Sequence, residues 1–192
     1  MSQPPITDVL RALVEALQSA GLRWYIFGAQ AVLVHGLPQQ TADIDVTIDP
    51  AERGTLDILA LLDRVDIRPR TSMFLEQARL LPLVHAPTGM AVDVVLAGEG
   101  IEEDFLARAV QVDLSGVVVP VLSVEDLIAT KVVAGRRQDR QDILGILQQG
   151  RAIDLVRLRA TLAAFDAGLD GPRATETFDR IHNSFVRPKR TR

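Results

Sequence analysis

Apolar and polar residues alternate along this chain with two periods, and each period predicts a different kind of element. Apolar residues at helical spacing predict an amphipathic helix over residues 7–20, with Thr7 as N-cap and Gly21 just past its end. A period of two over Asp43–Asp49 predicts a strand whose polar face is acidic or hydroxyl-bearing. Apolar runs predict further strands at Trp24–Phe27, Leu80–His85, Met90–Leu96 and Val117–Leu122.

Helical patterns lie between these strands and dominate the end of the chain. We expect helices at Ala29–Val34, from Pro50 to about Val65 and at Ile101–Val110, and mostly helix from Ser123 onward. This order predicts an α+β fold with three parts. They are an α/β core over residues 1–122, a helical C-terminal part over 123–186 and a basic tail over 187–192.

Composition excludes several classes of protein. The 192 residues include no cysteine, which excludes disulfides and thiolate metal sites. No run of about 18 apolar residues and no signal peptide is visible, so we expect a cytoplasmic protein that does not enter a membrane. The sequence has no Walker loop, Gly-x-Ser-x-Gly or His-Glu-x-x-His motif, which removes the enzyme classes that depend on them.

The net charge of −4 is not that of a DNA-coating protein, but the charge is uneven. Arginines crowd the last third of the chain, and the last six residues include Arg187, Lys189, Arg190 and Arg192. Such a stretch either binds a phosphate backbone or is a solvated tail, and the sequence leaves both interpretations open.

Two carboxylates on one strand are the first candidate for chemistry. Asp43 and Asp45 are two residues apart, so their side chains leave the same face of the strand about 7 Å apart along the chain. Oxygen ligands in this arrangement suit Mg²⁺ or Mn²⁺ beside the phosphates of a nucleotide. The alternative is the solvated face of an edge strand.

Asp93 and Gly28 strengthen the first interpretation. Asp93 lies in a run with apolar residues on both faces, which indicates an internal strand, where a carboxylate needs a metal ion or an arginine as partner. Gly28 ends one predicted strand and precedes a helix, a junction whose N–H groups and helix dipole favour an anion.

These residues together resemble the DNA polymerase β-like nucleotidyltransferases. The matching pattern is Gly28, then Asp43-Ile44-Asp45, then Asp93 on a neighbouring strand. The stretch GAQAVLVHGLPQQTADIDVTID, followed by LSVEDLIATKVVAGRRQDRQDIL, is most similar to the AbiEii-type toxins of bacterial toxin–antitoxin systems. The resemblance covers residues 20–150 and implies a mixed sheet flanked by helices.

The resemblance also implies a function. It implies a Mg²⁺- or Mn²⁺-dependent enzyme that moves NMP from an NTP to an acceptor hydroxyl, with RNA or tRNA as acceptor and an antitoxin protein as partner. Asp43, Asp45 and Asp93 would hold the metal ions, and Asp93 would also help to deprotonate the acceptor. Gly28 and Ala29 would line the phosphates. The downstream matches are Lys131, Arg136 and Asp139.

Lys131 and Arg136 are predicted to bind the triphosphate; the alternative is a lysine that extends along the surface and a solvated arginine. Lys131 lies four residues after Leu127 on a helix that runs from Ser123 to Gly135, so its stem starts near the buried stripe. We expect the helical part to close over the edge that carries Asp43 and Asp45. Asp139 is a further possible site residue, although capping of the next helix explains it well.

Two other interpretations stay open. Ala29 stands where Ser or Gly is usual, and Gln39 and Gln40 precede the acidic strand where an arginine is common, which favours a catalytically degenerate binding protein with the same fold. The other alternative is a structural α+β protein whose aspartates pair with arginines.

Overall fold

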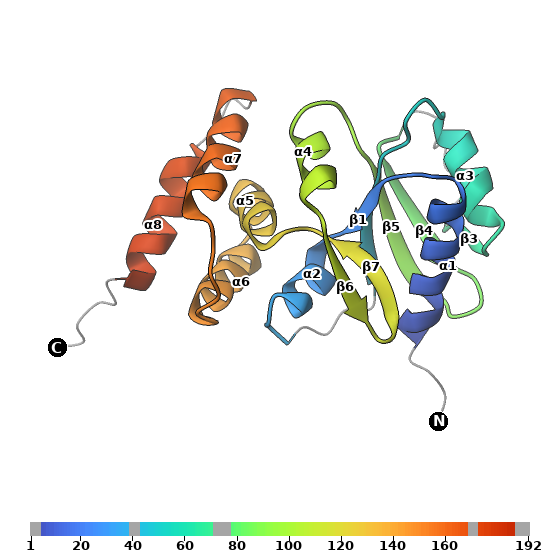
Figure 1. Ribbon diagram of the computed structural model, residues 1–192, viewed down its shortest axis with the longest axis horizontal. Helices are drawn as coiled ribbons and strands as arrows, with labels where there is room; N and C mark the ends of the chain where they lie inside the picture. The colour runs from blue at the N-terminus through green and yellow to red at the C-terminus, as the bar shows by residue number, and fades with distance from the viewer. Residues whose placement is uncertain (1–4, 39–42, 71–77, 169–172, 187–192) are drawn as a thin grey trace. The chain divides into compact units, whose positions relative to one another are not determined.

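The chain forms one sheet with helices packed on it, followed by a group of helices. The computed structural model describes residues 5–38, 43–70, 78–168 and 173–186, and these residues form seven strands and eight helices (Figure 1). The strands are β1 (Trp24–Ile26), β2 (Asp43–Ile48), β3 (Ile67–Pro69), β4 (Leu80–His85), β5 (Met90–Leu96), β6 (Val110–Leu114) and β7 (Val117–Val121). The helices are α1 (Pro5–Ser19), α2 (Gly28–Val34), α3 (Thr55–Asp63), α4 (Ile101–Arg108), α5 (Val124–Ala134), α6 (Arg137–Gln148), α7 (Leu155–Gly168) and α8 (Ala174–Val186).

The chain divides into two compact units. The first comprises Met1–Ala31 and Gln39–Leu122, and the second comprises Val32–Pro38 and Ser123–Arg192. Helix α2 therefore begins in the first unit and ends in the second.

The first unit is built on a mixed sheet with the strand order β3-β4-β5-β2-β1-β7-β6. β2 is parallel to β5 and β1 is parallel to β7, while the other neighbours are antiparallel. This arrangement, together with the helices of the second unit, confirms the predicted α+β fold. β5 is an internal strand between β4 and β2, as its apolar residues on both faces predict.

Helix α1 covers the sheet with an apolar stripe. Val9, Leu10, Leu13 and Leu17 are fully buried, and the helix contacts β5, β7 and α3. Burying four such side chains contributes about 1.5–3 kcal/mol each, which fixes the helix on the sheet more firmly than helix propensity could.

Two predicted helix starts are wrong. α1 begins at Pro5, and Thr7 lies buried within the helix instead of capping it. Proline is favoured in the first helical turn, where its missing N–H needs no partner. After Pro50 the chain first makes a turn: Asp49 Oδ1 accepts the N–H of Ala51 at 2.9 Å, Ala51 has φ of 53°, and α3 starts only at Thr55.

The second unit contains α5 to α8 and the segment Val32–Pro38. α5 contacts α6, α7 and α8, and Phe178 of α8 is fully buried. The Leu37 side chain lies against α6: a Cβ at Gly145 would be 2.7 Å from a Leu37 Cδ atom. Ser123 caps α5 and Gly135, in the left-handed conformation, ends it, as predicted.

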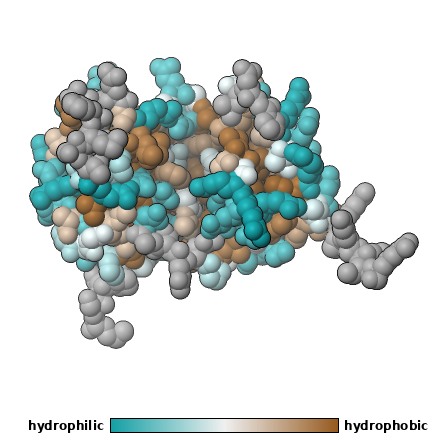
Figure 2. Space-filling model, turned by 180° about the vertical axis from the view of Figure 1, so that it is seen from behind, coloured by the Kyte–Doolittle hydropathy of each residue, from teal (hydrophilic) through white to brown (hydrophobic). Residues whose placement is uncertain are grey.

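The surface of the described residues is mixed. Figure 2 shows apolar residues interleaved with hydrophilic ones on the face that it presents. No helix among the described residues has the length and apolar character needed to span a bilayer.

Candidate active site at the β1–α2 turn and strands β2 and β5

The turn from β1 into α2 holds the Asp45 carboxylate. Phe27 donates its N–H to the Asp45 carbonyl at 3.0 Å, which extends the β1–β2 pairing to the turn. Gly28 then takes a φ of 62°. A Cβ on Gly28 would lie 1.8 Å from Asp45 Oδ2 and 2.7 Å from its Cγ. Only glycine therefore fits here, because any side chain would take the space of the carboxylate and strain the backbone.

The sheet register brings the three predicted carboxylates to one face. Asp45 is directly opposite Asp93 on the neighbouring parallel strand, and Asp43 is opposite Ala91. Opposite residues of adjacent strands share a face, and so do residues two apart on one strand. The intervening Ile44 is fully buried on the other face, whereas the three aspartates are half-buried. The structure thus gives all three access to the same side of the sheet.

Asp93 has a cationic partner that the sequence did not single out. The Arg70 guanidinium makes an ion pair with Asp93 Oδ1, and the exposed side-chain fractions are 39% for Arg70 and 29% for Asp93. The pair matches one alternative drawn from the sequence, an arginine beside Asp93. The sequence does not single out Arg70, because β3, the strand just before it, has a single apolar residue, Ile67, and so no strand pattern.

These residues fit a divalent cation by their chemistry. Carboxylate oxygens are the ligands that Mg²⁺ and Mn²⁺ prefer, Gly28 leaves room for the Asp45 carboxylate, and Asp93 already attracts a positive group. Within the described residues, however, no three acidic or histidine side chains are grouped closely enough to hold one metal ion. Using Asp93 as a ligand therefore requires its side chain to exchange partners.

Ala29 is the remaining predicted phosphate-lining residue, and Gln39 and Gln40 are the departures from the family pattern before the acidic strand. Ala29 is the second residue of α2 and is half-buried. Gln39 and Gln40 lie outside the described residues.

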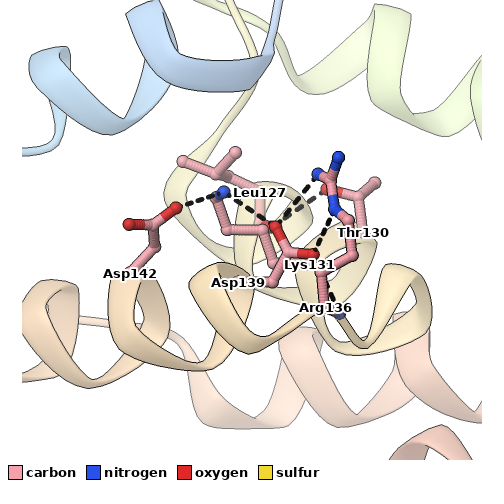
Figure 3. Close-up of polar contacts among 6 residues, drawn as sticks. All are labelled: Leu127, Thr130, Lys131, Arg136, Asp139 and Asp142. Carbon is pink, nitrogen blue, oxygen red and sulfur yellow. Dashed lines mark hydrogen bonds and ion pairs between the residues drawn. The ribbon is translucent and has the colours of Figure 1, made fainter. Parts of the chain in front are cut away.

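Lys131 lies in a buried ionic cluster within the second unit. Its Nζ contacts Asp142 at 2.6 Å and Asp139 at 3.2 Å, both on the next helix (Figure 3). Lys131 and Asp142 expose less than a tenth of their side chains and Asp139 exposes 1%. A buried lysine therefore has carboxylate partners from another helix, an arrangement that holds α5 and α6 together.

Asp139 has two tasks in this cluster. Its carboxylate accepts the backbone N–H of Arg136 at 3.1 Å, so it caps α6, and it also binds the Arg136 guanidinium (Figure 3). Burial alone would raise the pKa of Asp139, but the hydrogen bond from Arg136 and the charge of Lys131 lower it below the ordinary value of 3.8. Asp139 is thus a permanently ionised link between the two helices at neutral pH.

A pocket of about 310 Å³ borders this cluster. Its apolar lining residues include Val132, Ile143 and Ile181, and its polar ones are Lys131, Arg136, Arg140, Thr177 and Arg180. Arg136 exposes 76% of its side chain although it is paired with Asp139. The guanidinium groups make this pocket suited to an anion.

The comparisons with known proteins bear on the family and the fold of this chain. Residues 8–169 match the model of the family described as nucleotidyltransferase of unknown function, DUF6036. The chain belongs to this family. A search of curated proteins finds no match for it.

Solved structures show the same fold as this DUF6036 nucleotidyltransferase. The solution structure of the antibiotic-resistance factor ANT(2'')-Ia has a TM-score of 0.56 at 16% identity, covering 93% of this chain and 97% of that one. The antigenic nucleotidyltransferase-like protein from Paracoccidioides brasiliensis has 0.52 at 19% identity, covering 83% and 86%. The lincomycin-bound lincosamide adenylyltransferase LnuA has 0.52 at 13% identity, covering 73% and 94%. At these identities the likeness shows the fold alone.

Proposed function

We propose that this DUF6036 protein is an active, Mg²⁺- or Mn²⁺-dependent nucleotidyltransferase that moves NMP from an NTP to an acceptor hydroxyl. The observation that carries the proposal is the fit between Gly28 and Asp45: the turn leaves space that the carboxylate fills. A glycine in the left-handed conformation, packed against an acid, brings backbone N–H groups and a metal ligand to the same place.

Asp43, Asp45 and Asp93 would hold the metal ions. The bound metal supplies charge neutralisation of the triphosphate and of the pyrophosphate that leaves. Asp93 accepts the proton of the acceptor hydroxyl, whose oxygen bonds to the α-phosphorus as the bond to pyrophosphate breaks. Gly28 and Ala29 line the phosphates. Lys131 and Arg136 are the proposed cationic contacts of the nucleotide; Arg136 exposes 76% of its side chain, whereas Lys131 Nζ must leave Asp139 and Asp142 to make such a contact.

RNA, including tRNA, is the acceptor class we propose. Residues 123–192 carry thirteen Lys or Arg residues against nine Asp or Glu, whereas residues 1–122 carry eight against sixteen. A basic unit favours a polyanionic acceptor. Lincomycin is the molecule bound in the LnuA structure, and it is not the acceptor that we propose for this chain. The resemblance to AbiEii-type toxins supports a bacterial toxin–antitoxin role in the cytoplasm, with an antitoxin protein as partner.

The test is transfer of label from each α-³²P-labelled NTP to total RNA, to purified tRNA and to protein, with Mg²⁺ or Mn²⁺. We expect labelled RNA with the native protein and none with Asp45→Asn. The melting temperature of the Asp45→Asn variant should equal that of the native protein. Absence of transfer to any acceptor, with NTP binding retained, would instead favour the catalytically degenerate binding protein. The Asp93–Arg70 ion pair supports this second candidate, because it gives Asp93 a partner other than a metal ion.

A further inference from the structure

Arg70 reaches the candidate site from two strands away. Its N–H donates to the Pro82 carbonyl at 3.0 Å, which continues the β3–β4 pairing one residue beyond Pro69. Pro82 of β4 is in turn opposite Asp93 of β5, and Asp93 is opposite Asp45 of β2. Arg70, Pro82, Asp93 and Asp45 thus form one row across the sheet, and the guanidinium crosses β4 to contact the carboxylate.

This ion pair is well suited to exchange. Both side chains are partly open to solvent, and such pairs contribute little net stability, so breaking one is cheap. The hydrogen bond to Pro82 holds the Arg70 backbone in the row, so a released guanidinium remains within side-chain reach of the site.

We propose that Arg70 is the exchangeable cation of this site: it holds Asp93 until a divalent metal ion takes that carboxylate, and its freed guanidinium then binds a phosphate of the donor nucleotide. The proposal rests on the proposed function, because it needs Asp93 to be a metal ligand. Two positive groups beside one carboxylate repel each other, so Arg70 must weaken metal binding. A planar guanidinium beside a metal-bound triphosphate offers two parallel donors to phosphate oxygens, so Arg70 must strengthen nucleotide binding.

Removing the Arg70 guanidinium should therefore strengthen metal binding and weaken nucleotide binding. A residue with a merely structural role would not change the two affinities in opposite directions. Isothermal titration of the full chain with MnCl₂ alone is expected to show roughly tenfold tighter Mn²⁺ binding by Arg70→Gln, within the usual range for coupled sites. At saturating Mn²⁺, the α,β-methylene analogues of the four NTPs are expected to bind about tenfold more weakly to the same variant. Arg70→Lys keeps the charge without the planar fork, so it should show near-native Mn²⁺ affinity and weakened nucleotide binding.

Arg68→Gln is the matched control. Arg68 lies two residues earlier, is half-exposed and pairs with Asp63 and Asp66, so neither affinity should change. In an Asp93→Asn background, Arg70→Gln should no longer raise Mn²⁺ affinity. Unchanged or weaker Mn²⁺ binding by Arg70→Gln, or unchanged nucleotide binding, overturns the proposal.

The same titrations distinguish this failure from failure of the proposed function. If Asp45→Asn and Asp93→Asn weaken Mn²⁺ binding but Arg70→Gln has no effect, only the role of Arg70 is wrong. If neither aspartate variant affects Mn²⁺ binding, the metal site itself is wrong and both proposals fall.

Discussion

Asp45 Oδ2 lies 1.8 Å from the point where a Cβ on Gly28 would be, so residue 28 and the Asp45 carboxylate cannot both have side-chain atoms there. Gly28 is in the left-handed conformation as well. The turn after β1 and the acidic strand β2 therefore depend on each other, although Gly28 and Asp45 are seventeen positions apart along the chain.

Replacing Gly28 with alanine should displace the Asp45 carboxylate and abolish its role. Gly21→Ala is the matched control, because Gly21 has nearly the same φ, 65° against 62°, with no atom within 4 Å of its Cβ position. Both variants should lose about 1 kcal/mol from backbone strain. Only Gly28→Ala should also lose Mn²⁺ affinity, measured by titration. Equal Mn²⁺ binding by the two variants would mean that the position of Asp45 is unimportant.

Asp93→Asn should leave the fold almost as stable as before. The Arg70–Asp93 pair is partly solvated, and such pairs contribute at most about 1 kcal/mol. Urea unfolding monitored at Trp24, which is buried, would measure the change. A loss of several kcal/mol would identify the pair as a structural salt bridge and count against a metal-binding role.

Lys131→Met should destabilise the second unit strongly. Nζ contacts two buried carboxylates, and removing one partner of a buried ionic cluster typically costs on the order of 3 kcal/mol or more. Arg140→Met is the control: Arg140 is exposed, and its loss should change stability by less than about 0.5 kcal/mol. The variant Lys131→Met with Asp139→Asn and Asp142→Asn should recover part of the loss in a thermal melt. Nucleotide binding by Lys131 must accordingly be tested in a variant shown to be folded.

Asp139 should make the stability of the protein depend on acid pH. Its folded pKa is lowered below the ordinary 3.8, because the Arg136 hydrogen bond and the Lys131 charge outweigh burial. The unfolded chain then binds the proton more readily, so the stabilisation is complete above about pH 4 and is lost as pH falls through the folded pKa. Free energies of unfolding between pH 2 and 6 should fall less steeply for Asp139→Asn. A slope equal to that of the native protein would contradict the assignment.

Much of the site could be predicted because it follows from local pattern. Met90–Leu96 was predicted with its observed bounds, and the two-residue spacing of Asp43 and Asp45 requires them to share a face. The helix from Ser123 to Gly135 carries its own cap and stop signals. Local sequence signals thus predicted these elements, although they did not give the starts of α1 and α3.

What could not be predicted depends on pairing between distant segments. β3 is three residues long and includes Arg68 and Pro69, so it has no periodic signal, and it is a strand only because β4 pairs with it. Arg70 was missed for the same reason. β6 was missed because its partner is reached through Ser115-Gly116, where both residues have positive φ, a two-residue turn that the alternating pattern alone does not reveal.

The segment Val32–Pro38 has a practical consequence for anyone who divides this chain. A fragment that starts at Ser123 would contain all four C-terminal helices but would lack Leu37. The apolar surface beside Gly145 on α6, which Leu37 covers, would then be exposed to water. Such a fragment is expected to aggregate or to melt below the intact protein, and a synthetic peptide spanning residues 32–38 should bind and stabilise it. A single cut before Ser123 would therefore separate Val32–Pro38 from the unit to which this segment belongs.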